Sequence, residues 1–177
     1  MDLQLTEEQE ELSRVIRSML AREADESGLI APDRSGQAWA RLLEFGALNV
    51  GVGEGELGAI ELALIARELG ECLAEGSYVD TVSVRYAFGT SPLLGSDNAA
   101  FAVGLKEPSG RFSPTEPQTT LRAGVVTGEK TAVLGAGNAE QLFVTARGEG
   151  GPALVAISPS QIGVRLMDAR SLDSSTH

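Results

Sequence analysis

The pattern of apolar residues changes once along this chain, and that change limits the folds it can adopt. Up to about Ser96 the apolar residues recur at helical spacing, and from about Ala99 they form short runs separated by turn signals. The predicted helices cover about 7–23, 37–45, 57–69 and 76–88. The predicted strands cover about 99–105, 124–127, 131–134, 142–146, 153–157 and 163–167. We therefore expect an α+β protein, with an N-terminal helical bundle over 1–97 and a small antiparallel β-barrel or sandwich over 98–177, because no helical pattern separates the strands.

Local signals support the helical half. Thr6-Glu-Glu-Gln9 predicts a capping box, in which the threonine hydroxyl and the glutamine side chain satisfy exposed N–H groups of the first turn. Gly46 is placed to end the helix that contains Trp39. We expect Trp39 to fill the core, because large aromatic side chains bury much apolar area.

Composition excludes several partners. The 177 residues include 14 basic and 25 acidic ones, a net charge of −11, whereas nucleic-acid binding needs clustered lysine and arginine. No apolar run approaches the roughly 18–20 residues that cross a bilayer, so we expect no membrane span. The acidic start does not resemble a signal peptide, and the single Cys72 cannot form an internal disulfide. These features predict a cytoplasmic protein.

Common catalytic groups are scarce in this chain. The single histidine is His177, so no internal histidine can serve a Ser-His-Asp or Cys-His arrangement. No cysteine and histidine cluster has zinc spacing, and no acidic loop resembles an EF-hand, so we expect no metal site. Catalysis would therefore rely on carboxylates, backbone groups or a bound cofactor.

Two glycine-rich stretches mimic a dinucleotide-binding turn. Gly53 to Gly58 matches G-x-G-x-x-G before a helix, but its glutamates would face the pyrophosphate and no second strand follows that helix. Gly135 to Glu140 follows an apolar run, yet the next run begins too soon to leave room for a phosphate-binding helix. We interpret both stretches as turns.

Several stretches, taken in order, resemble the acyl-CoA dehydrogenase family. In the helical half these are Leu5-Thr-Glu-Glu-Gln9, Trp39 to Leu48 and Arg67-Glu-Leu-Gly70. In the β half they are Ala102-Val-Gly-Leu-Lys-Glu107-Pro108, Gly128-Glu-Lys130, Ala139 to Arg147 and Ser171-Leu-Asp173. The resemblance spans nearly all of this chain and about the first half of a typical family member.

The resemblance implies an FAD-dependent oxidoreductase of lipid metabolism that acts on the CH–CH group of an acyl-CoA thioester. In that family a carboxylate removes the α-proton while the β-hydrogen leaves as hydride to the flavin, and the protein supplies position and polarity. By the match, the cofactor contacts would be Gly104, Leu105, Lys106, Ser113, Val133, Leu134 and Gly135. The acyl-CoA contacts would be Ser109, Gly110 and Arg111.

The chain also departs from the family pattern. Lys106 stands where the family has threonine, and it either lies near flavin N5 as a charged donor or points into solvent. Ala132 and Leu134 stand where the family presents a tryptophan and a threonine to the ring, and Ser109 to Ser113 replaces the usual loop after Glu-Pro. Lys106, Ala132 and Leu134 favour an alternative, a non-catalytic structural or binding subunit of a hetero-oligomeric acyl-CoA dehydrogenase that no longer binds flavin. The retained Glu107-Pro108 and Lys130 favour the flavin-binding dehydrogenase. An unrelated α+β domain is a third interpretation.

The family's catalytic glutamate lies in a second helical bundle beyond the β-domain, and no residue of this chain matches it. We therefore expect no catalytic residue in this chain and no activity from it alone. The implied assembly is a homo- or hetero-oligomer, including one in which another chain supplies the C-terminal helical domain. We predict that the carboxylates of Glu54, Glu56, Glu107 and Glu116 are solvated or structural, as glutamates mostly are.

Overall fold

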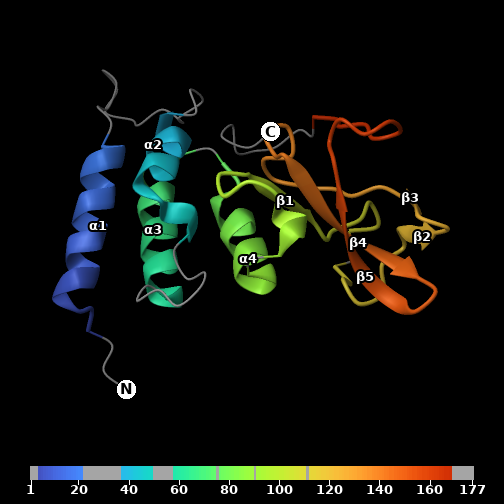
Figure 1. The fold of residues 1–177 in the computed structure, drawn as a ribbon, viewed down its shortest axis with the longest axis horizontal. Helices are drawn as coiled ribbons and strands as arrows, with labels where there is room; N and C mark the ends of the chain where they lie inside the picture. The colour runs from blue at the N-terminus through green and yellow to red at the C-terminus, as the bar shows by residue number, and fades with distance from the viewer. Residues whose placement is uncertain are drawn as a thin grey trace. The chain divides into compact units, whose positions relative to one another are not determined.

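The chain is built from two compact units, Met1–Asn98 and Ala99–His177. The computed structural model describes residues 4–21, 37–49, 58–74, 76–89, 91–110 and 112–168. All described α-helices lie in the first unit and all described strands in the second, so the protein is of the mixed α+β class (Figure 1). No helix among the described residues is long and apolar enough to cross a membrane.

The first unit contains helices α1 (Glu7–Leu20), α2 (Gln37–Phe45), α3 (Ala59–Glu71) and α4 (Tyr78–Phe88), with short 3₁₀ turns at Ala47–Asn49 and Pro92–Leu94. One apolar core joins all four helices, and Trp39 packs against it half-buried, as predicted. The fully buried side chains of this core include Ile16, Leu42, Leu48 and Ile65. The core therefore accounts for most of what holds the helices together.

The predicted capping box of α1 and the predicted end of α2 before Gly46 are confirmed. The Thr6 hydroxyl accepts from the Gln9 amide at 3.2 Å, and the Gln9 side chain accepts from the Thr6 amide at 3.0 Å. Gly46 follows the last residue of α2 with a φ of +79°, a conformation that favours glycine. Helix α1 ends at Leu20 with Ala21 as its C-cap, and α3 continues through Gly70 to Glu71, so the expected ends at about residues 23 and 69 are corrected. Most of the Gly53–Gly58 stretch lies outside the described residues.

A buried carboxylate lies where α1 faces α3. The Glu68 side chain is fully buried and accepts from Arg17 Nε at 2.8 Å and from Arg67 Nη2 at 2.6 Å. Burial raises the pKa of Glu68, but hydrogen bonds and charge attraction from the two arginines outweigh burial and leave the pKa below its ordinary value. Two turns earlier in α3, Glu61 accepts from the Gln9 side chain at 2.8 Å and from the Gly58 amide at 2.7 Å. The two helices are thus joined by polar contacts as well as by the core.

The second unit is a mixed five-stranded sheet built around one long strand. Its strands are β1 (Phe101–Gly104), β2 (Thr120–Arg122), β3 (Val125–Thr127), β4 (Gln141–Gly148) and β5 (Gly151–Ile157). The order is β1-β4-β2-β3, and β5 also pairs with β4. The β2–β3 and β4–β5 pairs are antiparallel, but β1–β4 and β2–β4 are parallel. The expectation of an antiparallel sheet is therefore only partly correct, and the described strands do not close into a barrel.

The reason for this correction lies in the long connection from β1 to β4. A parallel pair needs a crossover of about a dozen residues or more, which is usually but not necessarily helical. Here residues 105–140 supply that length, with the β2–β3 hairpin inside it. The absence of a helical pattern therefore did not exclude parallel pairing.

Two predicted strands do not form in the described part of the chain. Residues 131–134 form only a single bridge at Thr131 before a turn, because Ala132 adopts a left-handed φ of +52° that breaks the extended backbone. Residues 163–167 begin in a turn and pair with no described strand. Strand β2 was not predicted, since Thr120-Leu-Arg122 is too short to show alternation. The interpretation of residues 135–140 as a turn is confirmed at Gly135 to Asn138.

Candidate functional site

A buried carboxylate organises the centre of the β unit. The side chain of Glu107 follows β1 by three residues and is 7% exposed. It accepts from the Thr119 amide at 2.7 Å, the Thr119 hydroxyl at 2.8 Å and the Gln118 amide at 2.8 Å. It also accepts from Lys130 Nζ at 2.9 Å. Its two oxygens therefore accept hydrogen bonds from two other segments of the chain.

These contacts set the charge state of Glu107. Burial would raise its pKa, but hydrogen bonds from Lys130, from the Thr119 and Gln118 amides and from the Thr119 hydroxyl together lower the pKa to about 2. A general base near neutral pH needs a pKa close to the working pH. Glu107 is therefore a structural anion, as predicted from the sequence, and Glu116 is exposed.

Lys130 connects this carboxylate to the sheet. Its side chain is 8% exposed, and its ammonium group also donates to the Thr145 hydroxyl of β4 at 3.0 Å. The Glu107–Lys130 pair therefore joins the segment after β1, the segment after β3 and the central strand. We name Glu107, Thr119, Lys130 and Thr145 the carboxylate cluster. Sequence analysis selected Glu107 and Lys130 from motifs, but Thr119 and Thr145 carry no motif and could not be found that way.

Two glycines make room for the cluster. A Cβ at Gly128 would lie 2.5 Å from Thr119 Oγ1 and 2.8 Å from Thr119 Cα. A Cβ at Gly104 would lie 3.1 Å from Val144 Cγ1 and 3.2 Å from Lys130 Cγ. Gly104, one of the predicted cofactor residues, is thus buried in the sheet beside the cluster.

The structure brings together two groups of predicted cofactor residues. The Thr131 amide donates to the Lys106 carbonyl at 2.9 Å, which places Leu105 and Lys106 beside the segment that contains Val133, Leu134 and Gly135. We name residues 105–106 and 131–135 the paired segments.

The side chains of the paired segments differ in exposure. Val133 packs half-buried against a small core with Ala102, Leu142 and Val144. Leu134 is 51% exposed, and Lys106 is also exposed. The chain therefore presents apolar and charged side chains together at this edge.

Two of the predicted acyl-CoA residues, Ser109 and Gly110, lie in the loop between Glu107 and Thr119. The Gly110 amide donates to the Glu107 carbonyl at 2.9 Å, and Ser109 and Gly110 are exposed. Ser113 is half-buried, and its carbonyl accepts from the Glu116 amide at 3.1 Å. Arg111 lies outside the described residues. Both ends of the loop return to the carboxylate cluster, at Glu107 and at Thr119.

The fit of a flavin to these residues is partial. The exposed Leu134 and the half-buried Val133 offer an apolar edge, and the turn at Gly135 keeps that edge free of a bulky side chain. Against this, the Lys106 carbonyl is already bonded to Thr131, and Ala132 supplies no aromatic ring. The paired segments can hold one edge of a flavin ring, and Lys106 is the charged residue of these segments.

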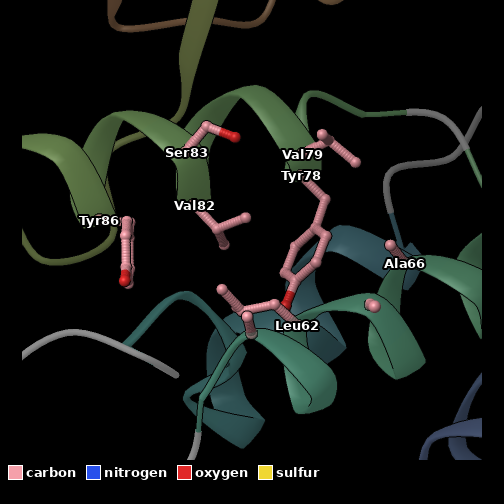
Figure 2. Close-up of a pocket in the computed structure, with 9 residues that line it drawn as sticks. Leu62, Ala66, Tyr78, Val79, Val82, Ser83 and Tyr86 are labelled. Carbon is pink, nitrogen blue, oxygen red and sulfur yellow. The ribbon is translucent and has the colours of Figure 1, made fainter.

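The helical unit has a groove that sequence analysis did not predict. It measures about 320 Å³ and lies between α3 and α4. Figure 2 shows Tyr78, Val82 and Tyr86 of α4 on one wall, with Leu62 and Ala66 of α3 on the other. The Tyr78 hydroxyl donates to the Ala47 carbonyl at 3.4 Å, and burial raises its pKa above the ordinary value. The groove is near the lower end of the size range of ligand pockets, about 300–1,000 Å³.

Comparison with known proteins gives matches at the level of structure. No protein-family model and no curated protein matches the sequence. The match to the ChsE4–ChsE5 complex from Mycobacterium tuberculosis covers 94% of this chain and 51% of the matched chain, with 22% sequence identity and a TM-score of 0.69. The match to the Tcur3481–Tcur3483 steroid ACAD covers 92% of this chain and 50% of the matched chain, with 21% sequence identity and a TM-score of 0.66. The match to an acyl-CoA dehydrogenase complexed with FAD from Bacillus anthracis covers 95% of this chain and 34% of the matched chain, with 20% sequence identity and a TM-score of 0.66.

These likenesses define the fold. The chain has the acyl-CoA dehydrogenase fold over nearly all of its length, so the resemblance predicted from the sequence is confirmed at that level. The chain spans between a third and about half of the solved chains that it matches.

Proposed function

We propose that this chain contributes the flavin-facing part of an acyl-CoA dehydrogenase-type oxidoreductase. The observation that carries the proposal is the joining of residues 105–106 to residues 131–135 by the Lys106–Thr131 hydrogen bond, within a fold that matches acyl-CoA dehydrogenases. The resemblance independently selected these same two segments as cofactor contacts. FAD would supply the acceptor for the hydride that leaves the β-carbon of an acyl-CoA thioester.

In this proposal the chain's own residues bind and orient. Val133 and Leu134 form an apolar wall against the edge of the flavin ring. The other residues that contact FAD are Gly104, Leu105, Gly135 and Ser113. The buried Glu107–Lys130 pair holds both segments rigidly, which keeps the ring edge in one position. Ser109, Gly110 and Arg111 contact the CoA part of the substrate.

The proposal places the proton-abstracting base outside this chain. Glu107 is excluded by the five hydrogen bonds that it accepts from four donor groups and by its pKa of about 2. We propose a hetero-oligomer as the working assembly, because two of the matched structures are two-component complexes, ChsE4–ChsE5 and Tcur3481–Tcur3483. A soluble cytoplasmic location completes the proposal.

The visible absorption spectrum of the purified complex tests this function. The chain is co-expressed with the protein that its gene neighbourhood supplies as a partner, and the flavin is quantified after denaturation. We expect stoichiometric FAD and bleaching of its absorption on addition of an acyl-CoA. A colourless complex at every partner ratio contradicts the proposal.

One observation favours a second candidate, a structural subunit without flavin. The paired segments carry Lys106, an alanine in a left-handed conformation at position 132 and a half-exposed Leu134, and none of these stacks on a ring. In that case the complex is colourless, but removal of this chain lowers the stability of its partner. Thermal unfolding of the partner with and without the chain separates the two candidates.

A further inference from the structure

Strand β5 lies at an edge of the sheet that the described strands form. Its residues Gly151–Ile157 pair with Gly148 to Leu142 of β4 and with no other described strand. No charged residue occurs from Gly150 to Val164. Proteins usually protect such an edge with charges, prolines or bulges, because its unpaired N–H and C=O groups can bind another strand.

Pro152 determines which backbone groups face outward. In an antiparallel pair, hydrogen-bonded and non-hydrogen-bonded residue pairs alternate. Pro152 lies opposite Arg147 and has no N–H, so this cannot be a hydrogen-bonded pair. The hydrogen-bonded pairs are therefore Gly148–Gly151, Ala146–Ala153, Val144–Val155 and Leu142–Ile157. The backbone groups of Pro152, Leu154 and Ala156 point to the free edge, where proline is normally found.

The geometry points to a second copy of this chain as the occupant of that edge. We propose that two β5 strands pair antiparallel about a two-fold axis, with Val155 opposite Val155 of the other copy. Leu154 of each copy then lies opposite Ala156 of the other. The N–H and C=O groups of Leu154 in each copy then bond to those of Ala156 in the other copy. The contact is therefore self-complementary.

Other registers leave backbone groups unpaired. If Pro152 lies opposite Leu154 or Ala156, a carbonyl of the other copy has no donor. If the strands shift the other way, so that Ala156 lies opposite Ala156, Leu154 pairs with Ser158 of the other copy. The Ser158 carbonyl would then have to accept from Leu154, but it already accepts from the Gln161 amide at 3.0 Å. The register centred on Val155 also brings no like charges together, since neither strand carries a charge.

The proposed contact is small. Two paired strands bury less than the roughly 1,200–2,000 Å² of a stable interface, so we expect a dimer that dissociates on dilution. It is independent of flavin binding and goes beyond the proposed function, because it requires only the backbone of β5.

Disulfide trapping in the full-length chain tests the register. In the proposed dimer the Cα atoms of a non-hydrogen-bonded pair lie about 4.5 Å apart, within the range for a disulfide. Val155→Cys should therefore form a covalent dimer in an oxidising buffer. Ala153→Cys is the matched control on the same strand and face, and its two copies would be offset by about 13 Å along the strands. We expect at least about tenfold less covalent dimer from it.

A second measurement does not depend on cysteine variants. Ala156→Pro removes an outward N–H without removing a bond to β4, and Ala156→Ser changes the side chain but keeps that N–H. In sedimentation equilibrium, Ala156→Pro should raise the dissociation constant at least about tenfold, and Ala156→Ser should leave it unchanged. The proposal is overturned by a monomer at all concentrations, by equal trapping of both cysteine variants, or by protection of the Leu154 and Ala156 amides from hydrogen exchange in the monomer. In the last case another segment covers the edge.

Discussion

The two units each bury a glutamate, and they compensate its charge in different ways. In the helical unit, Glu68 is held by Arg17 and Arg67, whose side chains are 59% and 46% exposed. In the β unit, Glu107 is held by Lys130, whose side chain is 8% exposed, and by two backbone amides. The first carboxylate has two solvent-exposed cationic partners, and the second has one buried cation.

This difference predicts where each unit is vulnerable. Glu68 keeps one arginine if the other is lost, and both arginines can be hydrated when they separate from it. Loss of Lys130 leaves Glu107 buried without a cation, and removal of one member of a buried ion pair is among the most destabilising single changes. The β unit should therefore depend on one side chain far more than the helical unit does.

Substitution of Lys130 tests this contrast with the largest expected effect. Lys130→Met leaves the Glu107 charge uncompensated and should destabilise the β unit by about 3–5 kcal/mol. Hydrogen exchange of the β4 amides measures the effect separately from the helical unit. Lys106→Met is the matched control, because Lys106 is exposed, and it should change stability by no more than about 0.5 kcal/mol. Equal effects of the two variants contradict the assigned role of Lys130.

Acid should weaken the β unit through the same carboxylate. The pKa of Glu107 falls from an ordinary 4.5 to about 2, so its contribution is complete above about pH 4.5 and is lost as the pH falls toward 2. The shift corresponds to about 3 kcal/mol. Unfolding by urea at a series of acidic pH values measures it. In Glu107→Gln the loss between about pH 4.5 and 2 should become smaller, and an unchanged pH dependence contradicts the prediction.

The glycine beside the cluster sharpens the contrast further. Gly128→Ala would place a Cβ 2.5 Å from Thr119 Oγ1, so the backbone must shift and the contacts of Glu107 with Thr119 must loosen. We expect a loss of about 1–3 kcal/mol, measured by chemical unfolding. Gly137→Ala is the control, since no atom lies within 4 Å of its added Cβ. A neutral Gly128→Ala would mean that Thr119 is not held tightly.

The smallest effect is expected in the helical unit. Arg17→Met removes one partner of Glu68, but Arg67 still donates to the same carboxylate at 2.6 Å. Exposed ion pairs contribute about 0–1 kcal/mol, so we expect a loss of no more than about 1 kcal/mol in thermal unfolding. A loss as large as that of Lys130→Met would remove the distinction between the two units.

The sequence was most informative where a pattern is local. The capping box at Thr6, the glycine that ends α2 and the half-buried Trp39 all follow from neighbouring residues and were predicted. Strand direction was not predictable, because the parallel pairing of β1 with β4 depends on residues about 40 positions apart. The apolar run at 131–134 predicted a strand, but the left-handed Ala132 leaves no sign in the composition.

The candidate site shows the same limit. Glu107 and Lys130 were selected because they stand in recognisable motifs, and the structure joins them. Thr119 and Thr145, which complete the hydrogen bonds of the cluster, lie in unremarkable stretches and become its members only through the fold. The β5 edge was not predicted. Its residues carry no charge, but the outward direction of its backbone groups depends on the pairing of Pro152 with Arg147.

Hydrogen exchange of the purified complex, with FAD present and after its removal, tests the central claim most directly. The account predicts that FAD slows the exchange of amides in residues 105–106 and 131–135, while α3 and the β2–β3 hairpin are unchanged. It also predicts that Lys130→Met, which releases both segments, lowers the FAD content of the complex. Retention of FAD with no change of exchange in the paired segments would contradict the account.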